Sequence, residues 1–361
     1  RVLQRFVSRC ADAPAPRTSA GTELAVCGQR SWPALWHSVP PKALGKIPKH
    51  ALPCYLRLAI GKCVFRHPYC LFVIPTRLSP MSDRLAVLPQ YLLPKQALTL
   101  LAGRIAGARG GRLTTRLIAW FVRRYRVNMA EAANPDIASY ASFNDFFTRE
   151  LKASARPLAK AALICPVDGA ISQFGPIVGQ QIFQAKGHHY SSTALLGGDA
   201  ELASRFDDGH FATLYLSPRD YHRIHMPCDG VLRRMMYVPG ELFSVNPTTA
   251  RGVPGLFARN ERVVCVFDGQ HGPFVLVLVG ATIVGSMATV WHGLVKAPRS
   301  AEISQWRYDD GSKLLKQGQE MGRFLLGSTV VMLWPKGRMQ FNPAWQAGGP
   351  VRLGEVMANG D

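Results

Sequence analysis

Three short segments of the chain carry residue types that enzymes use to activate a hydroxyl group. They contain, in chain order, an acid in a turn at Asp168, a histidine pair at His222 and His225, and a glycine followed by a serine at Gly327 and Ser328. In such a set the histidine takes the serine proton, while the acid orients the imidazole and stabilises its charge. We therefore expect an activated Ser328, although an Asp-Gly pair alone is most often only a turn.

The surroundings of Ser328 differ from those of a common hydrolase nucleophile. The serine lies between two strand-like runs and not in the Gly-x-Ser-x-Gly turn of an α/β-hydrolase. Because Gly327 has no side chain, its carbonyl is open to attack by the next hydroxyl, and the expected product is self-cleavage between these two residues. Two alternatives stay open. One is a serine hydrolase of lipid esters, which needs Ser328 intact, and the other is a non-catalytic lipid-binding protein with a bulged strand.

The histidines and cysteines do not form the pattern of a metal site. His222 and His225 are three residues apart, which places them on opposite faces of an extended segment, and no third ligand stands at a telling spacing. We expect no metal, with one histidine for the chemistry and the other for support. The eight cysteines lack C-x-x-C and zinc-finger spacing, which indicates free thiols in a reducing compartment.

The elements that position these residues are predicted to form an α+β fold. Ser142 caps a helix over residues 142–151, with Asp145 three residues on and its three phenylalanines on a buried side. Beyond residue 160 the chain has short apolar runs between glycines and prolines, with no alternating βαβ rhythm, so we expect a mainly antiparallel β-rich body. The predicted strands cover residues 211–216, 231–238, 262–267, 274–279, 281–284 and 324–333.

The basic residues are concentrated at one end of the chain. The 361 residues have a formal net charge of +20 and 47% hydrophobic residues, a globular composition. Lys and Arg outnumber Asp and Glu by 12 to 2 in residues 1–80 and by 9 to 1 in residues 81–130, but only by 22 to 20 in residues 131–361. A nucleic-acid enzyme spreads its basic residues over a binding face, so this distribution favours a membrane-binding segment attached to a nearly neutral catalytic body.

Residues 81–130 have the pattern of short amphipathic helices. Pro89 and Pro94 limit the first helix, so two or three short helices are expected instead of one long one. Beyond a break at Gly110-Gly111, one helix face is predicted to carry Leu113, Leu117, Trp120 and Phe121, and another Arg112, Arg116 and Arg123. Such a helix suits an anionic membrane surface. The alternative is a helix packed on its own domain with a solvated basic face.

Residues 1–80 show no sustained period and contain scattered prolines. Their most apolar stretch is interrupted by charges, so it lacks the roughly 20 apolar residues of a spanning helix, and no signal-peptide cleavage site follows it. We expect an unstructured or wrongly assigned extension, with Met81 as the natural start. A targeting extension is the alternative.

Several motifs follow one another in a fixed order. They are Phe143-Asn144-Asp145-Phe146-Phe147-Thr148-Arg149-Glu150-Leu151, Pro166-Val167-Asp168-Gly169, Gln184-Ala185-Lys186-Gly187-His188-His189-Tyr190, Leu216-Ser217-Pro218-Arg219-Asp220-Tyr221-His222-Arg223-Ile224-His225-Met226-Pro227, Asn260-Glu261-Arg262-Val263, and Gly318-Gln319-Glu320-Met321-Gly322-Arg323-Phe324 leading into Leu326-Gly327-Ser328-Thr329. In this order they resemble the phosphatidylserine decarboxylases of the bacterial membrane-associated type. The resemblance covers about residues 81–356, and bacterial members begin near Met81.

The resemblance implies a mechanism that agrees with the chemistry read from the residues. In this family the precursor cuts itself between Gly327 and Ser328 by an N-to-O acyl shift and β-elimination, and Ser328 becomes an N-terminal pyruvoyl group. Asp168, His225 and Ser328 match the family's charge relay, and His222 matches a second histidine implicated in decarboxylation. The pyruvoyl group would form a Schiff base with phosphatidylserine and accept the electrons released as carbon dioxide leaves, which gives phosphatidylethanolamine.

The resemblance also implies partners and a location. The large and small chains of the precursor would stay associated, and the enzyme would lie on the cytoplasmic face of the cell membrane as a peripheral protein. The substrate's acyl chains stay in the bilayer, so a basic, apolar helix pair at the N-terminus would place the site at the headgroup plane. No nucleic acid is expected as a partner.

Overall fold

The computed structural model describes residues 80–282, 287–295, 302–325, 329–337 and 339–360. The chain divides between residues 74 and 75, and all the described residues belong to the second unit. The predictions for residues 1–79 therefore lie outside the described residues, as do those for Gly327 and Ser328 themselves. The elements that flank these two residues are described.

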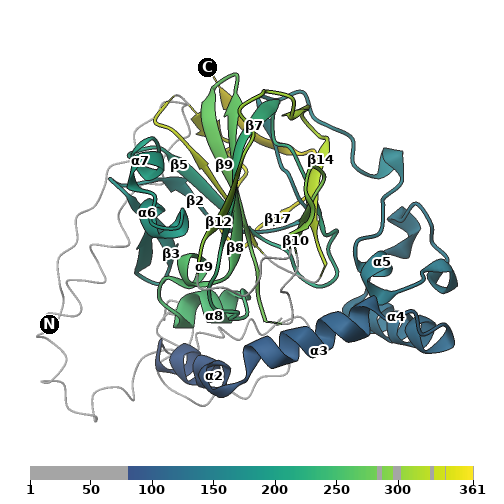
Figure 1. Ribbon diagram of the computed structural model, residues 1–361. Coiled ribbons are helices and arrows are strands. Elements are labelled where there is room, and N and C mark those ends of the chain that lie inside the picture. The colour runs from purple at the N-terminus through teal and green to yellow at the C-terminus, as the bar shows by residue number, and fades with distance from the viewer. Residues whose placement is uncertain (1–79, 283–286, 296–301, 326–328, 338, 361) are drawn as a thin grey trace, which may run out of the picture. The chain divides into compact units, whose positions relative to one another are not determined.

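Three short helices open the described part of the chain (Figure 1). They are α2 (Pro80–Leu92), α3 (Lys95–Gly107) and α4 (Arg112–Tyr125). Pro94 precedes α3, and Gly111 adopts a φ of 54° directly before α4, a left-handed conformation that glycine adopts at little cost. The expected division into short helices is confirmed. None of the helices in the described residues is long and apolar enough to cross a membrane.

The face of α4 that packs inward differs from the predicted apolar face. Ile118 and Phe121 are buried, whereas Leu113 is 70% exposed and Trp120 is 51% exposed. The four residues of the predicted apolar face, Leu113, Leu117, Trp120 and Phe121, share one side of this helix as predicted, but only Phe121 among them is buried. The reason is the tertiary contact with α5 (Phe143–Phe147), whose phenylalanines pack against Phe121 and draw one side of the stripe into the core.

Helix α5 begins as predicted and ends early. The Ser142 hydroxyl accepts from the backbone N–H of Asp145, and the Asp145 carboxylate accepts from the backbone N–H of Ser142, which is a complete capping box. The helix ends at Phe147, although the sequence predicts it to residue 151. Thr148 is the C-cap, and its hydroxyl donates to the carbonyl of Asn144 in the preceding turn.

A large antiparallel sheet forms the centre of the body. Its strand order is β12-β7-β8-β9-β15-β5-β2-β17, with β13 paired to β7. The bounds are β12 (Ser304–Arg307), β7 (Gly230–Val238), β8 (Arg262–Gly269), β9 (Gly272–Val279), β15 (Thr329–Trp334), β5 (His210–Tyr215), β2 (Gly169–Pro176), β17 (Pro350–Val351) and β13 (Leu314–Leu315).

Smaller sheets complete the body. One has the order β11-β10-β14-β6, a second has β1-β18-β16, and β3 pairs with β4. Their bounds are β11 (Gly293–Val295), β10 (Met287–Thr289), β14 (Glu320–Phe324), β6 (Arg223–His225), β1 (Leu163–Ile164), β18 (Val356–Gly360), β16 (Met339–Phe341), β3 (Gln181–Ala185) and β4 (His188–Ser191). The named strand pairs are antiparallel, so the predicted α+β fold with a β-rich body behind N-terminal helices is confirmed.

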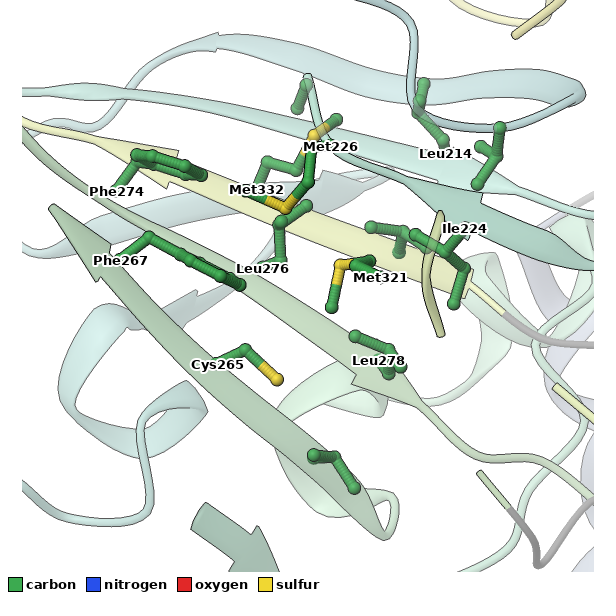
Figure 2. Packing of buried hydrophobic residues seen from close by; sticks show 14 of the residues in the cluster. Leu214, Ile224, Met226, Cys265, Phe267, Phe274, Leu276, Leu278, Met321 and Met332 are labelled. Atoms are coloured by element: carbon green, nitrogen blue, oxygen red, sulfur yellow. The ribbon is translucent and has the colours of Figure 1, made fainter. Parts of the chain in front are cut away.

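Both faces of the large sheet are covered, which explains why its central strands read as continuous apolar runs. On one face Leu276 and Met332 pack in the same cluster as Ile224 of β6 and Met321 of β14, as Figure 2 shows. The other face packs against α6 (Ser192–Leu195), α7 (Ala200–Ser204), α8 (Pro247–Gly252) and α9 (Leu256–Arg259). In Figure 1 these helices lie on the opposite side of the large sheet from β10 and β14.

Two strand predictions need correction. The run predicted over residues 324–333 is two strands, since β14 ends at Phe324 in the small sheet and β15 begins at Thr329 in the large one. The described strands on either side of residues 326–328 therefore belong to two different sheets. In the strand predicted over residues 281–284, the described residues Ala281 and Thr282 belong to no strand, and residues 283 and 284 lie outside the described part.

Helix α2 is held to the body by a buried charge cluster. The carboxylate of Asp83 is only 1% exposed and accepts from Lys186, which follows β3, and from Arg251 of α8. These hydrogen bonds hold the pKa of Asp83 below its ordinary value. The neighbouring Gln184 is fully buried and donates to the carbonyls of Ala250 and Val253. The Gln-Ala-Lys-Gly motif therefore positions α2 and α8.

Candidate active site

Strand pairing brings the ends of the 326–328 segment to the two predicted histidines and to Asp168. On one side, the N–H of Phe324 donates to the carbonyl of His222 over 3.0 Å. On the other side, Thr329 lies opposite Tyr215 of β5, and Tyr215 lies opposite Ala170, two residues beyond Asp168. The fold therefore brings the histidine segment and the Asp168 segment to the strand ends that flank residues 326–328.

Asp168 is buried directly before β2, and its closest charged partner is an arginine. Its carboxylate accepts from Nε of Arg156 over 2.9 Å and from the N–H of Leu353 over 2.9 Å. Arg156 also pairs with Glu131 over 2.7 Å, and these two carboxylates raise the pKa of the guanidinium. Gly169 must be a glycine because an added Cβ would collide with the carbonyl oxygen of Tyr215.

His225 is placed so that its Nε2 carries the lone pair. Its Nδ1 lies 2.8 Å from the carbonyl oxygen of Gly318, and because a carbonyl only accepts, Nδ1 must hold the proton. Nε2 then accepts from the hydroxyl of Tyr221 over 3.2 Å. Burial lowers the pKa of His225, while the Gly318 carbonyl, the charge of Glu320 and, most weakly, the charge of Asp168 raise it.

A direct hydrogen bond between Asp168 and His225, as a simple relay would have, is not among the contacts of the described residues. The carbonyl of Gly318 takes the orienting position at Nδ1, and Asp168 acts on the imidazole only through its charge. The sequence motifs contain both Asp168 and Gly318, but nothing in them indicated that Arg156 would bind the Asp168 carboxylate. These two residues are 12 positions apart and meet only in the fold.

His222 is fully buried and has one unused nitrogen. Its Nδ1 donates to the carbonyl of Asp220 over 2.8 Å, so Nε2 is unprotonated, and Nε2 has no hydrogen-bond partner among the described residues. The ring lies 4.0 Å from the ring of Phe147, centroid to centroid. Burial lowers the pKa of His222 to about 3, so the ring is neutral at neutral pH. The two histidines therefore have the same tautomer.

Sequence reasoning missed several residues at the site. His225 is contacted by Tyr221 and Gly318, Asp168 by Arg156, and His222 by Phe147. All of these contacting residues except Arg156 lie inside the motifs. Their presence in the motifs was a signal that they matter. Their partners could be assigned only from the fold.

Comparison with known proteins agrees with this geometry. Residues 143–359 match the family model described as phosphatidylserine decarboxylase, and residues 85–126, which fall on α2–α4, match a second model described as PSD.

The chain belongs to the phosphatidylserine decarboxylase family. It is 81% identical over 278 residues to the phosphatidylserine decarboxylase proenzyme of Albidiferax ferrireducens, which covers 77% of this chain and 98% of the relative. It is 74% identical over 279 residues to that of an Azoarcus species, covering 77% of this chain and 97% of the relative. The corresponding proenzyme of Dechloromonas aromatica is 71% identical over 279 residues, covering 77% and 99%. The family resemblance predicted from the motifs is confirmed.

Proposed function

We propose that this chain decarboxylates phosphatidylserine to phosphatidylethanolamine and carbon dioxide, with a pyruvoyl group made by self-cleavage between Gly327 and Ser328. The observation that carries the proposal is the placement of His222 and His225 against β14, the strand that leads into residues 326–328. Each has its lone pair on Nε2. The proenzyme names of the relatives support the self-processing step.

In the processing step, Nε2 of His225 takes the hydroxyl proton of Ser328. The Gly318 carbonyl holds Nδ1–H and so fixes the tautomer in which Nε2 is the base. As the imidazole becomes charged, the buried carboxylate of Asp168 stabilises that charge across the intervening space. The ion pair with Arg156 fixes the Asp168 carboxylate in place. Asp168, His225 and Ser328 therefore act in processing as the family resemblance implies.

The buried polar atoms beside the strand ends that flank residues 326–328 fit a small polar group there. Nε2 of His222 and Oγ1 of Thr329 are buried without a partner among the described residues, one on each side of the segment. A pyruvoyl ketone at position 328 would supply the electron sink that decarboxylation of an α-amino acid requires and that side chains lack.

His222 is suited to move the proton of the decarboxylation step. A neutral Nε2 accepts the proton of the substrate's ammonium group, and the resulting imidazolium returns a proton to the substrate's α-carbon after carbon dioxide leaves. Because burial strongly disfavours the charged ring, His222 does not retain that proton. The packing of Phe147 against the ring excludes water from it.

Strand pairing would hold the two products of the cut together. Strand β15 lies between β9 and β5, and it begins at Thr329 on the C-terminal side of the cut. Further along the same piece, β17 pairs with β2 and β18 pairs with β1. The small chain would therefore contribute strands to two sheets of the large chain, and cleavage would not release it.

Helices α2–α4 would place the site at an anionic membrane surface, on the cytoplasmic face. They expose apolar side chains alongside arginines, which suits an interfacial helix. The exposed apolar side chains are Leu85, Leu88, Tyr91, Leu92, Leu98, Leu100, Leu101, Ile105, Leu113 and Trp120. The free thiols of Cys165, Cys228 and Cys265 fit a reducing compartment.

Incubation of the purified protein with phosphatidylserine tests this function. We expect phosphatidylethanolamine and carbon dioxide in equal amounts with no release of fatty acid, and we expect neither product from Ser328→Ala. Release of fatty acid by an uncut chain would instead support a lipid hydrolase. No turnover by a chain that still binds the lipid would support a binding protein.

A further inference from the structure

A cavity of about 350 Å³ lies beside the candidate active site and is rich in arginine. Asp168 and Tyr221 are in its wall, so it borders both the buried carboxylate and the residue bonded to His225. Its lining includes five arginines and three acids. The arginines are Arg126, Arg149, Arg156, Arg219 and Arg352.

The excess positive charge in this cavity is concentrated on a few of those arginines. Arg156 is neutralised by Asp168 and Glu131, and Asp220 lies 3.7 Å from Arg219. No ion pair of Arg149 with a carboxylate is found in the described part of the chain, where its guanidinium reaches only the Arg219 carbonyl. The lining therefore has two more positive than negative groups, and Arg149 is its innermost unpaired cation.

Arg149 is an unusual arginine because it is buried without a counterion. It is 4% exposed, its Nε has no acceptor among the described residues, and its Nη2 is 3.5 Å from the carbonyl oxygen of Arg219. Its guanidinium lies 5.3 Å from the centre of the Phe146 ring. Burying an unpaired guanidinium is costly, and its planar N–H groups match the oxygens of a phosphate. The cavity is therefore built to receive an anion.

The position of the cavity indicates which part of a phospholipid it would hold. Arg126, which ends α4, is exposed and lines the cavity on the side of the apolar helices, while Tyr221 lines it on the side of the histidines. In the proposed substrate, the phosphodiester lies between the acyl chains and the reacting serine. We propose that Arg149, with Arg126 and Arg219 beside it, binds the phosphodiester of the headgroup. This inference rests on the proposed function.

The serine carboxylate, which is the other anion of the substrate, fits this site poorly. A guanidinium clamped on the carboxylate would stabilise the charge that must be lost as carbon dioxide leaves, and so would stabilise the ground state more than the transition state. The phosphodiester does not change during the reaction. Binding it holds substrate and product alike, so its loss affects KM more than kcat.

Binding of a phosphodiester lipid that cannot react tests the proposal. The probe is dihexanoyl phosphatidylglycerol, which has the phosphodiester but neither amine nor carboxylate, measured by titration calorimetry on the processed protein. We expect Arg149→Met to weaken binding at least tenfold, which is the order expected for a charged hydrogen-bonded contact. Arg126→Gln, at an exposed position that does not endanger folding, is expected to weaken it about threefold. Arg233→Gln, whose arginine pairs with Asp268 elsewhere, is the matched control and should bind normally.

Kinetics with dihexanoyl phosphatidylserine give a second readout. KM should rise at least tenfold in Arg149→Met with kcat within about threefold, and Arg149→Lys should recover part of the loss because it keeps the charge without the planar fork. Equal binding of phosphatidylglycerol by the wild type, Arg149→Met and Arg126→Gln would overturn the proposal. Loss of phosphatidylserine binding with unchanged phosphatidylglycerol binding would also overturn it, because the carboxylate would then be the ligand.

Two further arms separate the remaining possibilities. Tight binding of inorganic phosphate that displaces no phosphatidylglycerol would assign the cavity to a free anion and overturn the headgroup assignment. A wild type that binds phosphatidylglycerol through Arg149 but does not decarboxylate phosphatidylserine would retain the subsite and overturn the proposed function. Normal turnover of phosphatidylserine, with phosphatidylglycerol binding unaffected by either arginine variant, would retain the proposed function and overturn the phosphodiester subsite.

Discussion

The β-rich body and the N-terminal helices place their apolar side chains in opposite ways. In the body, residues such as Val263, Phe267 and Leu276 are completely buried between layers. On α2–α4, Leu92 is 88% exposed and Leu113 is 70% exposed, and most of the large exposed apolar side chains in the described residues lie on these helices or between them. The body buries most of its large apolar side chains in its own core. The helices expose theirs, and in our proposal a membrane surface covers them.

This contrast separates two tasks. The groups proposed for processing and decarboxylation lie in the body and are mostly buried, whereas the groups proposed for membrane binding are exposed on the helices. Substitutions in one region should therefore leave the other task intact.

The largest expected effect is on processing in the body. His225→Ala removes the base for Ser328, and Asp168→Ala removes the charge that stabilises the imidazolium. Both proteins should stay uncut or cleave very slowly, as followed by denaturing gel over hours, and the wild type should be cut. Vesicle binding should not change. Prompt cleavage of His225→Ala would remove that histidine from processing.

The next effect is on decarboxylation after a normal cut. His222→Ala should process, yet its kcat should fall by about 10²–10⁴-fold because the proton-transfer group is gone. His189→Gln is the matched control, since His189 is exposed and hydrogen bonds only to the carbonyl of Gly187 in the described structure. A His222→Ala protein with normal kcat would contradict the assignment.

The helices supply the third effect. Replacing Leu113 and Trp120 by serine should weaken binding to phosphatidylglycerol-containing vesicles at least tenfold, because two large exposed apolar groups are removed. Sedimentation with vesicles measures this effect. Leu314→Ser, at a side chain 51% exposed on β13 of the body, is the control and should bind normally. Equal losses in all three variants would mean that binding does not localise to the helices.

The smallest effect is a pH dependence of stability within the body. The pKa of His222 falls from 6.5 to about 3 on folding, so between these values the unfolded chain binds a proton that the folded chain does not. Stability should therefore fall as pH decreases below about 6.5, by up to about 1.4 kcal/mol per pH unit. Urea unfolding from pH 5 to pH 8 in the uncut Ser328→Ala background measures it. His222→Gln should show the shallower slope, and parallel slopes would contradict the burial of a neutral ring.

Local patterns predicted some of this architecture well. The capping box at Ser142 follows from residue spacing alone. The antiparallel body follows from short apolar runs that do not alternate with helices. Tertiary contacts decide the early end of α5, the burial of Phe121 and the division of residues 324–333 between two sheets, so no local pattern could indicate them.

The candidate site shows the same limit. Motifs and the family resemblance named Asp168, His222, His225 and Ser328. They did not show that the Gly318 carbonyl would orient His225 or that Arg156 would bind the Asp168 carboxylate. Each of these hydrogen bonds joins two segments that come together only when the chain folds.

The central claim is that Ser328 is consumed to make the cofactor, and intact mass under denaturing conditions tests it most directly. The wild type should give a large piece ending at Gly327 and a C-terminal piece of 34 residues whose N-terminus carries a ketone in place of the serine amine. Ser328→Ala should stay whole. An uncut wild-type chain that still decarboxylates phosphatidylserine, or a Ser328→Ala chain that still splits at this bond, would contradict the account.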